Sequence, residues 1–252
     1  MNQASQSRGG QKRLNVEQVR EFHHDHFVRD QVADFLAIAA TLAARGPVVD
    51  MGGGCGFFAS ALQASAGLST SVVDMDAASI EACHDKGVEG RLGDALDPPI
   101  DGDEAVVCFN LILHHLVGST DATTRALQSR ALAVWRGRAA GLFVNEYIYE
   151  AWLAPRVSAW LIWQVTSSRL FSTIGKVVAR VVPSLSANTF GVGVRFRASS
   201  DWERLFEECG FQVVRTCRGA DEPVSLARRL LLIRSCRRDS YLLKASDRRE
   251  PA

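Results

Sequence analysis

The sequence lacks a closely spaced cysteine pair and a long uninterrupted apolar run. Its six cysteines are scattered, at Cys55, Cys83, Cys108, Cys209, Cys217 and Cys236. This spacing argues against a zinc site or a disulfide framework, and it indicates a reducing compartment such as the cytoplasm. The most apolar stretch, residues 147–182, is interrupted by basic residues and so does not predict a transmembrane span.

An excess of charge is also missing. With 29 Lys and Arg against 28 Asp and Glu, the net charge is +1, which argues against a nucleic-acid partner. Residues 1–13 are polar with no apolar segment behind them, so we expect a flexible tail rather than a secretory signal. A second disordered tail is expected at 246–252. The length of 252 residues is that of one domain with an elaboration.

What the chain does contain is a glycine-rich turn at Val48–Leu62, with the sequence VVDMGGGCGFFASAL. A short apolar run leads into Gly52–Gly56, and a helix-compatible segment follows. Glycines have no Cβ, so the chain can turn at φ > 0 and a ligand can approach the backbone. The helix then presents free N–H groups to that ligand. The pattern predicts a small-molecule site, although a tight turn without a ligand would use the same residues.

Two ligand classes fit this turn. Gly54–Ala59 satisfies the G-x-G-x-x-A pattern of dinucleotide-binding enzymes. The stretch Asp50–Gly56 satisfies acid-x-Gly-x-Gly-x-Gly in full, and it resembles motif I of class I S-adenosylmethionine (SAM) methyltransferases. The choice between a dinucleotide and SAM therefore depends on the residues that follow in the chain.

Alternating strand and helix signals follow the turn. Strands are expected at 48–51, 71–76, 88–92, 105–113 and 141–146, and helices at 57–66, 77–86 and 121–135. This order predicts an α/β fold with a doubly wound Rossmann-like sheet. The nearly continuous apolar run AVVCFNLIL at 105–113 is typical of a central parallel strand. Because ligands bind at the carboxyl ends of such strands, the polar residues there are candidates for a site.

The methyltransferase resemblance, which covers 47–146 in good order, assigns roles to these residues. Asp74 lies 20 residues after Gly54, where such folds place a carboxylate for the ribose hydroxyls. The resemblance implies that Asp94 accepts from the adenine amino group and that Ala95 forms a wall of the adenine slot. The implied SAM-binding set is Asp50, Gly52, Gly54, Gly56, Asp74, Met75, Asp94, Ala95 and Asn110.

Two further segments resemble small-molecule O-methyltransferases of the plant caffeic-acid type. Leu113-His114-His115-Leu116 is similar to their L-H-D-W motif, in which the histidine is the general base, and His115 replaces the aspartate. Val144–Ile148 places Glu146 where that family has a glutamate beside the histidine. The implied catalytic residues are His114, Glu146 and His115. Packing near the cofactor is the alternative role for His114, and scaffolding of the SAM site or a place on the surface is the alternative for Glu146. The family's N-terminal dimerisation domain has no counterpart, so its specificity does not carry over.

The segments outside this core extend the prediction. Residues 199–245 resemble the end of the class I methyltransferase sheet, with strands at 211–215 and 239–244 forming a C-terminal antiparallel hairpin that dinucleotide folds lack. The sequence does not decide whether residues 226–233 form a helix or a strand. The Trp-rich stretch 147–198 predicts an inserted helical lid; a homodimer face, or a membrane-surface contact through 151–182, is the alternative. Residues 14–46 predict capping helices.

The histidines His23, His24 and His26 of this segment flank Asp25, but no second acid or further histidine is paired with them, so no metal site is expected. A solvated polar face is the favoured interpretation, and a helix over the cofactor mouth with one histidine near the substrate is the alternative. The sequence as a whole predicts a cytoplasmic, seven-stranded SAM-dependent methyltransferase. Its substrate would be a small, largely apolar or aromatic molecule, methylated on a hydroxyl with a histidine base. An NAD(P)-dependent oxidoreductase and a non-catalytic binding protein of the same fold remain as alternatives.

Overall fold

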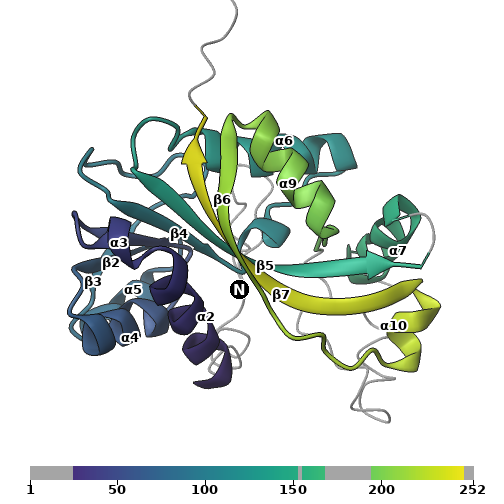
Figure 1. The fold of residues 1–252 in the computed structure, drawn as a ribbon, viewed down its shortest axis with the longest axis horizontal. Coiled ribbons are helices and arrows are strands. Elements are labelled where there is room, and N and C mark those ends of the chain that lie inside the picture. Colours follow the sequence, from purple (N-terminus) through teal and green to yellow (C-terminus); the bar gives the residue numbers. More distant parts are fainter. Residues whose placement is uncertain (1–24, 153–154, 168–193, 247–252) are drawn as a thin grey trace, which may run out of the picture.

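The computed structural model describes residues 25–152, 155–167 and 194–246. They form one seven-stranded sheet in the order β3-β2-β1-β4-β5-β7-β6 (Figure 1). The strands are β1 (Val48–Met51), β2 (Thr70–Asp74), β3 (Glu89–Leu92), β4 (Val106–Asn110), β5 (Gly141–Ala151), β6 (Phe211–Arg218) and β7 (Ile233–Ala245). Strands β1 to β5 pair in parallel, and β7 is antiparallel to both β5 and β6. The predicted doubly wound sheet with a C-terminal hairpin is confirmed.

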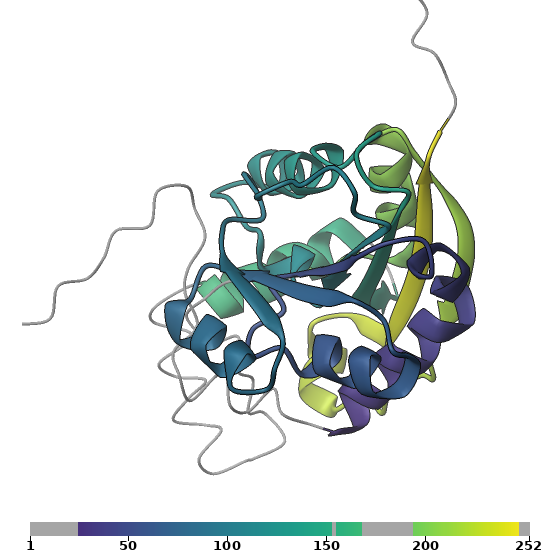
Figure 2. The same cartoon turned by 90° about the vertical axis from the view of Figure 1, so that its left-hand side faces the viewer.

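Helices cover both faces of this sheet (Figures 1 and 2). They are α2 (Asp25–Ile38), α3 (Ala40–Ala43), α4 (Phe57–Ala66), α5 (Ala77–His84), α6 (Asp121–Ala133), α7 (Pro155–Ser167), α9 (Ser199–Glu208) and α10 (Leu226–Leu230), with a 3-10 turn η1 at Leu113–His115. The helix predicted at 57–66 is found with those bounds. The helices predicted at 77–86 and 121–135 end two residues earlier than expected.

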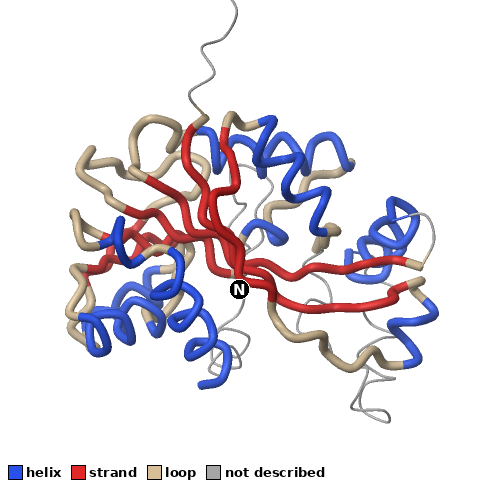
Figure 3. Tube along the Cα trace, viewed as in Figure 1, coloured by secondary structure: helices blue, strands red, loops and turns tan. Residues whose placement is uncertain are grey.

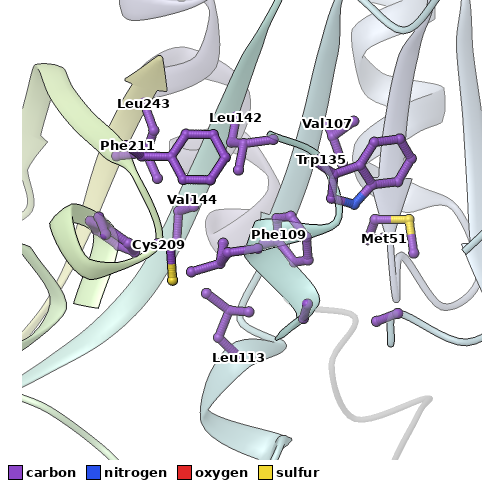
Figure 4. Packing of buried hydrophobic residues seen from close by; sticks show 14 of the residues in the cluster. Met51, Val107, Phe109, Leu113, Trp135, Leu142, Val144, Cys209, Phe211 and Leu243 are labelled. Atoms are coloured by element: carbon purple, nitrogen blue, oxygen red, sulfur yellow. The ribbon is translucent and has the colours of Figure 1, made fainter. Parts of the chain in front are cut away.

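Each face has its own apolar core. On one side Phe35 of α2 makes edge contacts with Phe58 of α4 and Phe143 of β5. On the other side Trp135, Trp202 and many strand residues pack between α6, α9 and the sheet (Figure 4). Val106–Phe109 of β4 are buried on both faces, which explains the nearly continuous apolar run. The strand predicted at 105–113 ends at Asn110, and η1 follows at Leu113–His115.

Strands β5 and β7 are longer than predicted. The sequence placed the end of the fifth strand at Glu146 and the start of the last strand at Asp239. Instead, residues 147–151 continue β5 and pair with 233–238 of β7, beyond the ends of all other strands (Figure 3). This ribbon has a small core of its own, formed by Ile162, Val194, Phe196, Ile233 and Cys236. Burial on this core explains why the strands run on.

The predicted insertion at 147–198 therefore begins as strand and continues as helix α7. The ambiguous stretch 226–233 becomes the short helix α10 followed by the start of β7. Residues 1–24, 168–193 and 247–252, on which both predicted tails and much of the predicted lid fall, lie outside the described residues. No helix among the described residues is long and apolar enough to cross a membrane.

Candidate active site

The turn between β1 and α4 exposes bare backbone to a cavity. Gly52, Gly54 and Gly56 have φ angles of 67°, 53° and 75°, in the left-handed region that side-chain-bearing residues rarely adopt. A Cβ at Gly52 would collide with the Ile112 side chain, and one at Gly53 with the Asp50 carboxylate. Gly52 and Gly53 therefore have no room for a Cβ, and Gly52, Gly54 and Gly56 adopt φ angles that favour glycine.

The cavity has a volume of about 240 Å³, close to the lower end of the roughly 300–1,000 Å³ usual for small-molecule sites. It lies at the carboxyl ends of β1, β2 and β4 and below α2. The residues lining it include Val28, Gln31, Asp50, Gly52, Gly53, Gly54, Asp74, Met75, Gly93, Ala95, Asn110, Leu111, Ile112 and His115. The structure thus brings together most of the cofactor-binding residues expected from the sequence.

Asp50 lies at the base of the cavity and is 2% exposed. Its Oδ1 accepts a hydrogen bond from Asn110 Nδ2 at 2.9 Å. Burial raises the pKa of Asp50 to about 7, and the nearby Asp74 carboxylate adds to the increase. A carboxyl group in this state sits near its titration midpoint at neutral pH, and a cation in the cavity would favour its ionised form.

Asp74 ends β2 at the opposite wall. Its Oδ2 accepts from the Gly54 N–H and its Oδ1 from the Asp76 N–H, both at 2.9 Å. Burial raises the pKa of Asp74, although these backbone donors act in the opposite direction. Each carboxylate oxygen has a second lone pair, so Asp74 can still accept from hydroxyl groups in the cavity. Its neighbour Asp76 instead caps α5 by accepting from Ser79 N–H at 3.0 Å.

Two of the expected cofactor residues, Gly56 and Asp94, are not among those that line the cavity. Gly56 precedes α4, where a Cβ would come within 2.9 Å of Cys83 Sγ. Asp94 Oδ1 accepts a hydrogen bond from the Leu96 N–H at 2.8 Å. The Asp94 carboxylate therefore stabilises the turn that begins at Asp94. The flanking Gly93 and Ala95 do line the cavity.

Next to the cavity, η1 and β5 form a buried His–Glu pair. His114 Nδ1 lies 2.7 Å from Glu146 Oε2, with side-chain exposures of 3% and 0%. Glu146 Oε1 also accepts from the N–H groups of Leu113 and His114, at 2.7 and 3.3 Å. A carboxylate held by two backbone donors orients the imidazole so that Nδ1 donates and Nε2 is left as the acceptor.

His115 differs from its neighbour in both position and partners. It lines the cavity, and its ring centroid is 4.2 Å from that of His114. Burial, followed by the neighbouring His114, holds the pKa of His115 well below its usual range. Its buried Nδ1 has no hydrogen-bond partner in the part of the chain that the structure describes. The three residues predicted to be catalytic therefore lie together, with His115 nearest the cavity.

The sequence did not identify the aromatic residues around His114. Phe196 stacks on its ring at 5.0 Å, and Tyr149 stacks on Phe196 at 4.3 Å. Phe196 reaches this position because residues 194–198 run beside β5: Arg195 N–H donates to His114 O, and Tyr149 N–H to Arg197 O. The alternation of apolar and basic residues in VRFRA, at 194–198, is typical of an extended chain. It does not indicate which strand this segment lies beside.

The contributions of α2 were also missed. Gln31 Nε2 donates to Asn145 Oδ1 at 3.1 Å, and Val28 and Gln31 line the cavity. The sequence predicted capping helices over 14–46, but it did not indicate that Val28 and Gln31 would line the cavity. Of the nearby histidines, His23 and His24 lie outside the described residues, and the side chain of His26 is not described.

No protein-family model and no curated protein matches the sequence. Solved structures do resemble it. The mitomycin 7-O-methyltransferase MmcR matches with a TM-score of 0.53 and 16% identity, over 88% of this chain and 53% of that protein. Magnesium protoporphyrin IX methyltransferase (ChlM) from Synechocystis PCC 6803, with bound S-adenosylhomocysteine (SAH), matches with a TM-score of 0.51 and 15% identity, over 93% of this chain and 90% of that one.

A third match is the O-methyltransferase NcsB1 from neocarzinostatin biosynthesis, in complex with SAH and 1,4-dihydroxy-2-naphthoic acid. It has a TM-score of 0.50 and 20% identity, over 87% of this chain and 56% of that protein. The chain thus spans about half the length of MmcR and NcsB1. These likenesses show that the chain has the Rossmann-like fold of SAM-dependent methyltransferases.

Proposed function

We propose that this chain, with its methyltransferase fold, is an enzyme that transfers a methyl group from SAM to a hydroxyl of a small, largely apolar or aromatic molecule. The observation that carries the proposal is the buried His114–Glu146 pair beside the glycine-lined cavity. A binding protein without catalysis has no need for such a pair, because burying two polar groups costs stability.

The cavity residues fit SAM by their chemistry. Asp74 offers carboxylate lone pairs for ribose hydroxyls, and Met75, Ala95 and Ile112 offer apolar walls for adenine. Asp50 and Asp74 supply negative charge for a ligand that carries a sulfonium and an ammonium group. Asp94, which turns its carboxylate to Leu96 N–H, is proposed to contribute at the adenine edge with its remaining oxygen.

When bound, SAM supplies a methyl group on a positively charged sulfur. His114 is proposed to remove the proton of the acceptor hydroxyl at Nε2, while Glu146 holds Nδ1–H and stabilises the imidazolium. His115, which stays neutral, would line the passage between cofactor and acceptor. Positioning of the acceptor oxygen in line with the methyl group would supply much of the remaining rate.

The surroundings of His114 support an aromatic acceptor. Phe196 stacks on His114, and Tyr147 meets both rings edge-on, at 6.0 Å from His114 and 5.8 Å from Phe196. These rings pack on His114 and do not line the cavity, and aromatic side chains beside a base favour contact with flat, apolar molecules. The neighbour NcsB1 holds a dihydroxynaphthoic acid, and hydroxylated naphthoic acids are therefore the first acceptors to screen. A cytoplasmic location and the use of 147–198 as a lid belong to the same proposal.

The test combines binding with turnover. Calorimetric titration with SAM, SAH and NADH is expected to show binding of both adenosyl ligands that is weakened in Asp74→Asn. His114→Ala is expected to keep SAM affinity and to lose about 10²–10⁴-fold in methyl transfer. His84→Ala is the matched control, because His84 is exposed on α5 and does not line the cavity.

Glu146→Gln tests the pair itself. An amide would present its NH₂ group to His114 Nδ1, so that the proton moves to Nε2 and the acceptor nitrogen is lost. Turnover is expected to fall while SAM affinity stays. Unchanged turnover in His114→Ala would refute the base assignment. Binding of NADH without SAM would favour an oxidoreductase, and binding of neither would favour a non-catalytic protein.

A further inference from the structure

The far end of the β5–β7 ribbon gathers helices α7 and α10 and the residue that follows β5 (Figures 1 and 3). Ser158 Oγ of α7 donates to Leu231 O, just after α10, at 2.7 Å. Trp152 N–H donates to Leu232 O at 3.0 Å. These contacts hold Trp152, α7 and α10 together on one end of the molecule, away from the parallel strands.

This end is unusually apolar for a surface. Six large hydrophobic side chains are exposed among the described residues, and four of them lie here: Trp152 (64% exposed), Val157 (46%), Trp160 (50%) and Leu230 (82%). Val157 and Trp160 are three residues apart and so share one face of α7. We call these four residues the ribbon-end patch. A gathering of this kind marks a surface with a partner, whereas single exposed hydrophobics need no explanation.

The charge of the described residues around the patch is mainly basic. Residues 155–167 and 223–238 contain no Asp or Glu, although the whole chain has a net charge of only +1, and the nearby acids Glu150 and Glu222 are ion-paired with arginines. Arg229 and Arg234 are exposed. Neither forms an ion pair with another described residue. The neighbouring Arg228 and Arg237 are paired, with Glu222 and with Asp239 and Glu150 respectively.

We infer that the ribbon-end patch, together with Arg229 and Arg234, docks this protein on a membrane surface that contains anionic lipids. Exposed tryptophans favour the bilayer interface, and arginines beside them bind lipid phosphates. A second copy of the chain would bring the same arginines face to face, and like charges oppose such an interface. The inference does not depend on the proposed methyl transfer.

Sedimentation of the full chain with sucrose-loaded vesicles tests this, using phosphatidylcholine alone and a 3:1 mixture with phosphatidylglycerol. We expect binding to the mixed vesicles that weakens at high salt. Arg229→Gln with Arg234→Gln should weaken this binding about 25-fold, at roughly fivefold for each arginine. Trp152→Ala with Trp160→Ala should weaken it about tenfold or more, because both indoles would lose interfacial burial.

The double variant Val214→Ala, Arg215→Gln is the matched control. It removes one exposed hydrophobic residue and one exposed arginine from β6, far from the ribbon end, and should bind as the wild type. Circular dichroism melts establish that each variant is folded. Equal sedimentation with and without anionic lipid, or wild-type binding by both patch variants, would overturn the inference. So would a concentration-dependent dimer that the patch variants dissociate, if the wild type does not sediment with vesicles.

Discussion

The buried carboxyl of Asp50 leads to a testable prediction. Replacing this residue should stabilise the ligand-free protein at pH 8, although Asp50 belongs to the candidate site. Its pKa is raised to about 7 by burial, whereas in the unfolded chain it is about 3.9. The folded protein therefore keeps a proton on Asp50 that the unfolded chain has already lost. Below about pH 4 Asp50 is protonated in both states and the free energy of unfolding is not reduced. As the pH rises from about 4 to about 7, ionisation of Asp50 in the unfolded chain lowers the free energy of unfolding.

The magnitude follows from this difference. About three pKa units at ~1.36 kcal/mol per unit give an upper limit of about 4 kcal/mol, and relaxation around the site reduces this to about 2–3 kcal/mol. Asn in place of Asp50 is neutral at every pH and can still accept from Asn110 Nδ2. We expect Asp50→Asn to match the wild type near pH 4 and to exceed it at pH 8 by about 2–3 kcal/mol, or roughly 5–10 °C in Tm.

Ligand-free protein has to be used, in urea unfolding at pH 4, 5, 6, 7 and 8. The raised pKa of Asp34 is present in both proteins and cancels in the difference. Asp74 interacts with Asp50, so the measured difference includes the loss of this interaction. SAM should reverse the ranking, because its cationic groups favour ionised Asp50 and have no such partner in the variant. If the wild type and Asp50→Asn differ by the same amount at pH 4 and pH 8, Asp50 does not titrate in this range and the reasoning is wrong.

Two other substitutions test the cavity and the core. Gly53→Ala should weaken SAM binding tenfold or more in calorimetry, because the new Cβ collides with the Asp50 carboxylate; Gly67→Ala, with no atom near its Cβ, should cost stability but leave affinity intact. Phe35→Ala should lower the free energy of unfolding by about 3–5 kcal/mol, since its ring is fully buried against Phe58 and Phe143. Leu36→Ala, partly exposed on the same helix, should cost less, and equal costs would contradict this packing.

Much of the parallel sheet could be predicted because its signals are local. The run at 105–113 is apolar except for Asn110, as β4 requires for burial on both faces, and Gly52, Gly54 and Gly56 have the left-handed φ angles that their sequence suggested. Asp76 caps α5 from the position directly before its first residue. Each of these features depends on a few consecutive residues, so a single sequence is sufficient to find it.

The extended ribbon could not be predicted in the same way. Its burial depends on Phe196 and Val194 arriving from a distant part of the chain to pack on Tyr147 and Tyr149. Arginines at 234, 237 and 238 gave β7 a polar appearance, which suggested that the strand started only at Asp239. In the fold, Arg237 is buried and paired with Asp239 and Glu150, and a pairing across strands leaves no local pattern.

The His–Glu pair shows how a motif and a register combine. β4 and β5 pair so that Asn110 lies opposite Asn145, and Leu111 N–H donates to Asn145 O at 2.8 Å. Leu111 then adopts φ 55°, a conformation that costs a leucine energy and persists only where the surroundings enforce it. This turn directs the next residues back over β5, so that the N–H groups of Leu113 and His114 meet Glu146 Oε1.

The spacing of the motif therefore identified His114 and Glu146 as neighbours, while the strained residue that brings them together is visible only in the structure. Leu111 lies in the left-handed region between β4 and the buried His114, and stability alone does not explain the cost of this conformation. Its occurrence at the end of β4, between the cavity residue Asn110 and His114, supports the view that the geometry of this site is maintained for chemistry.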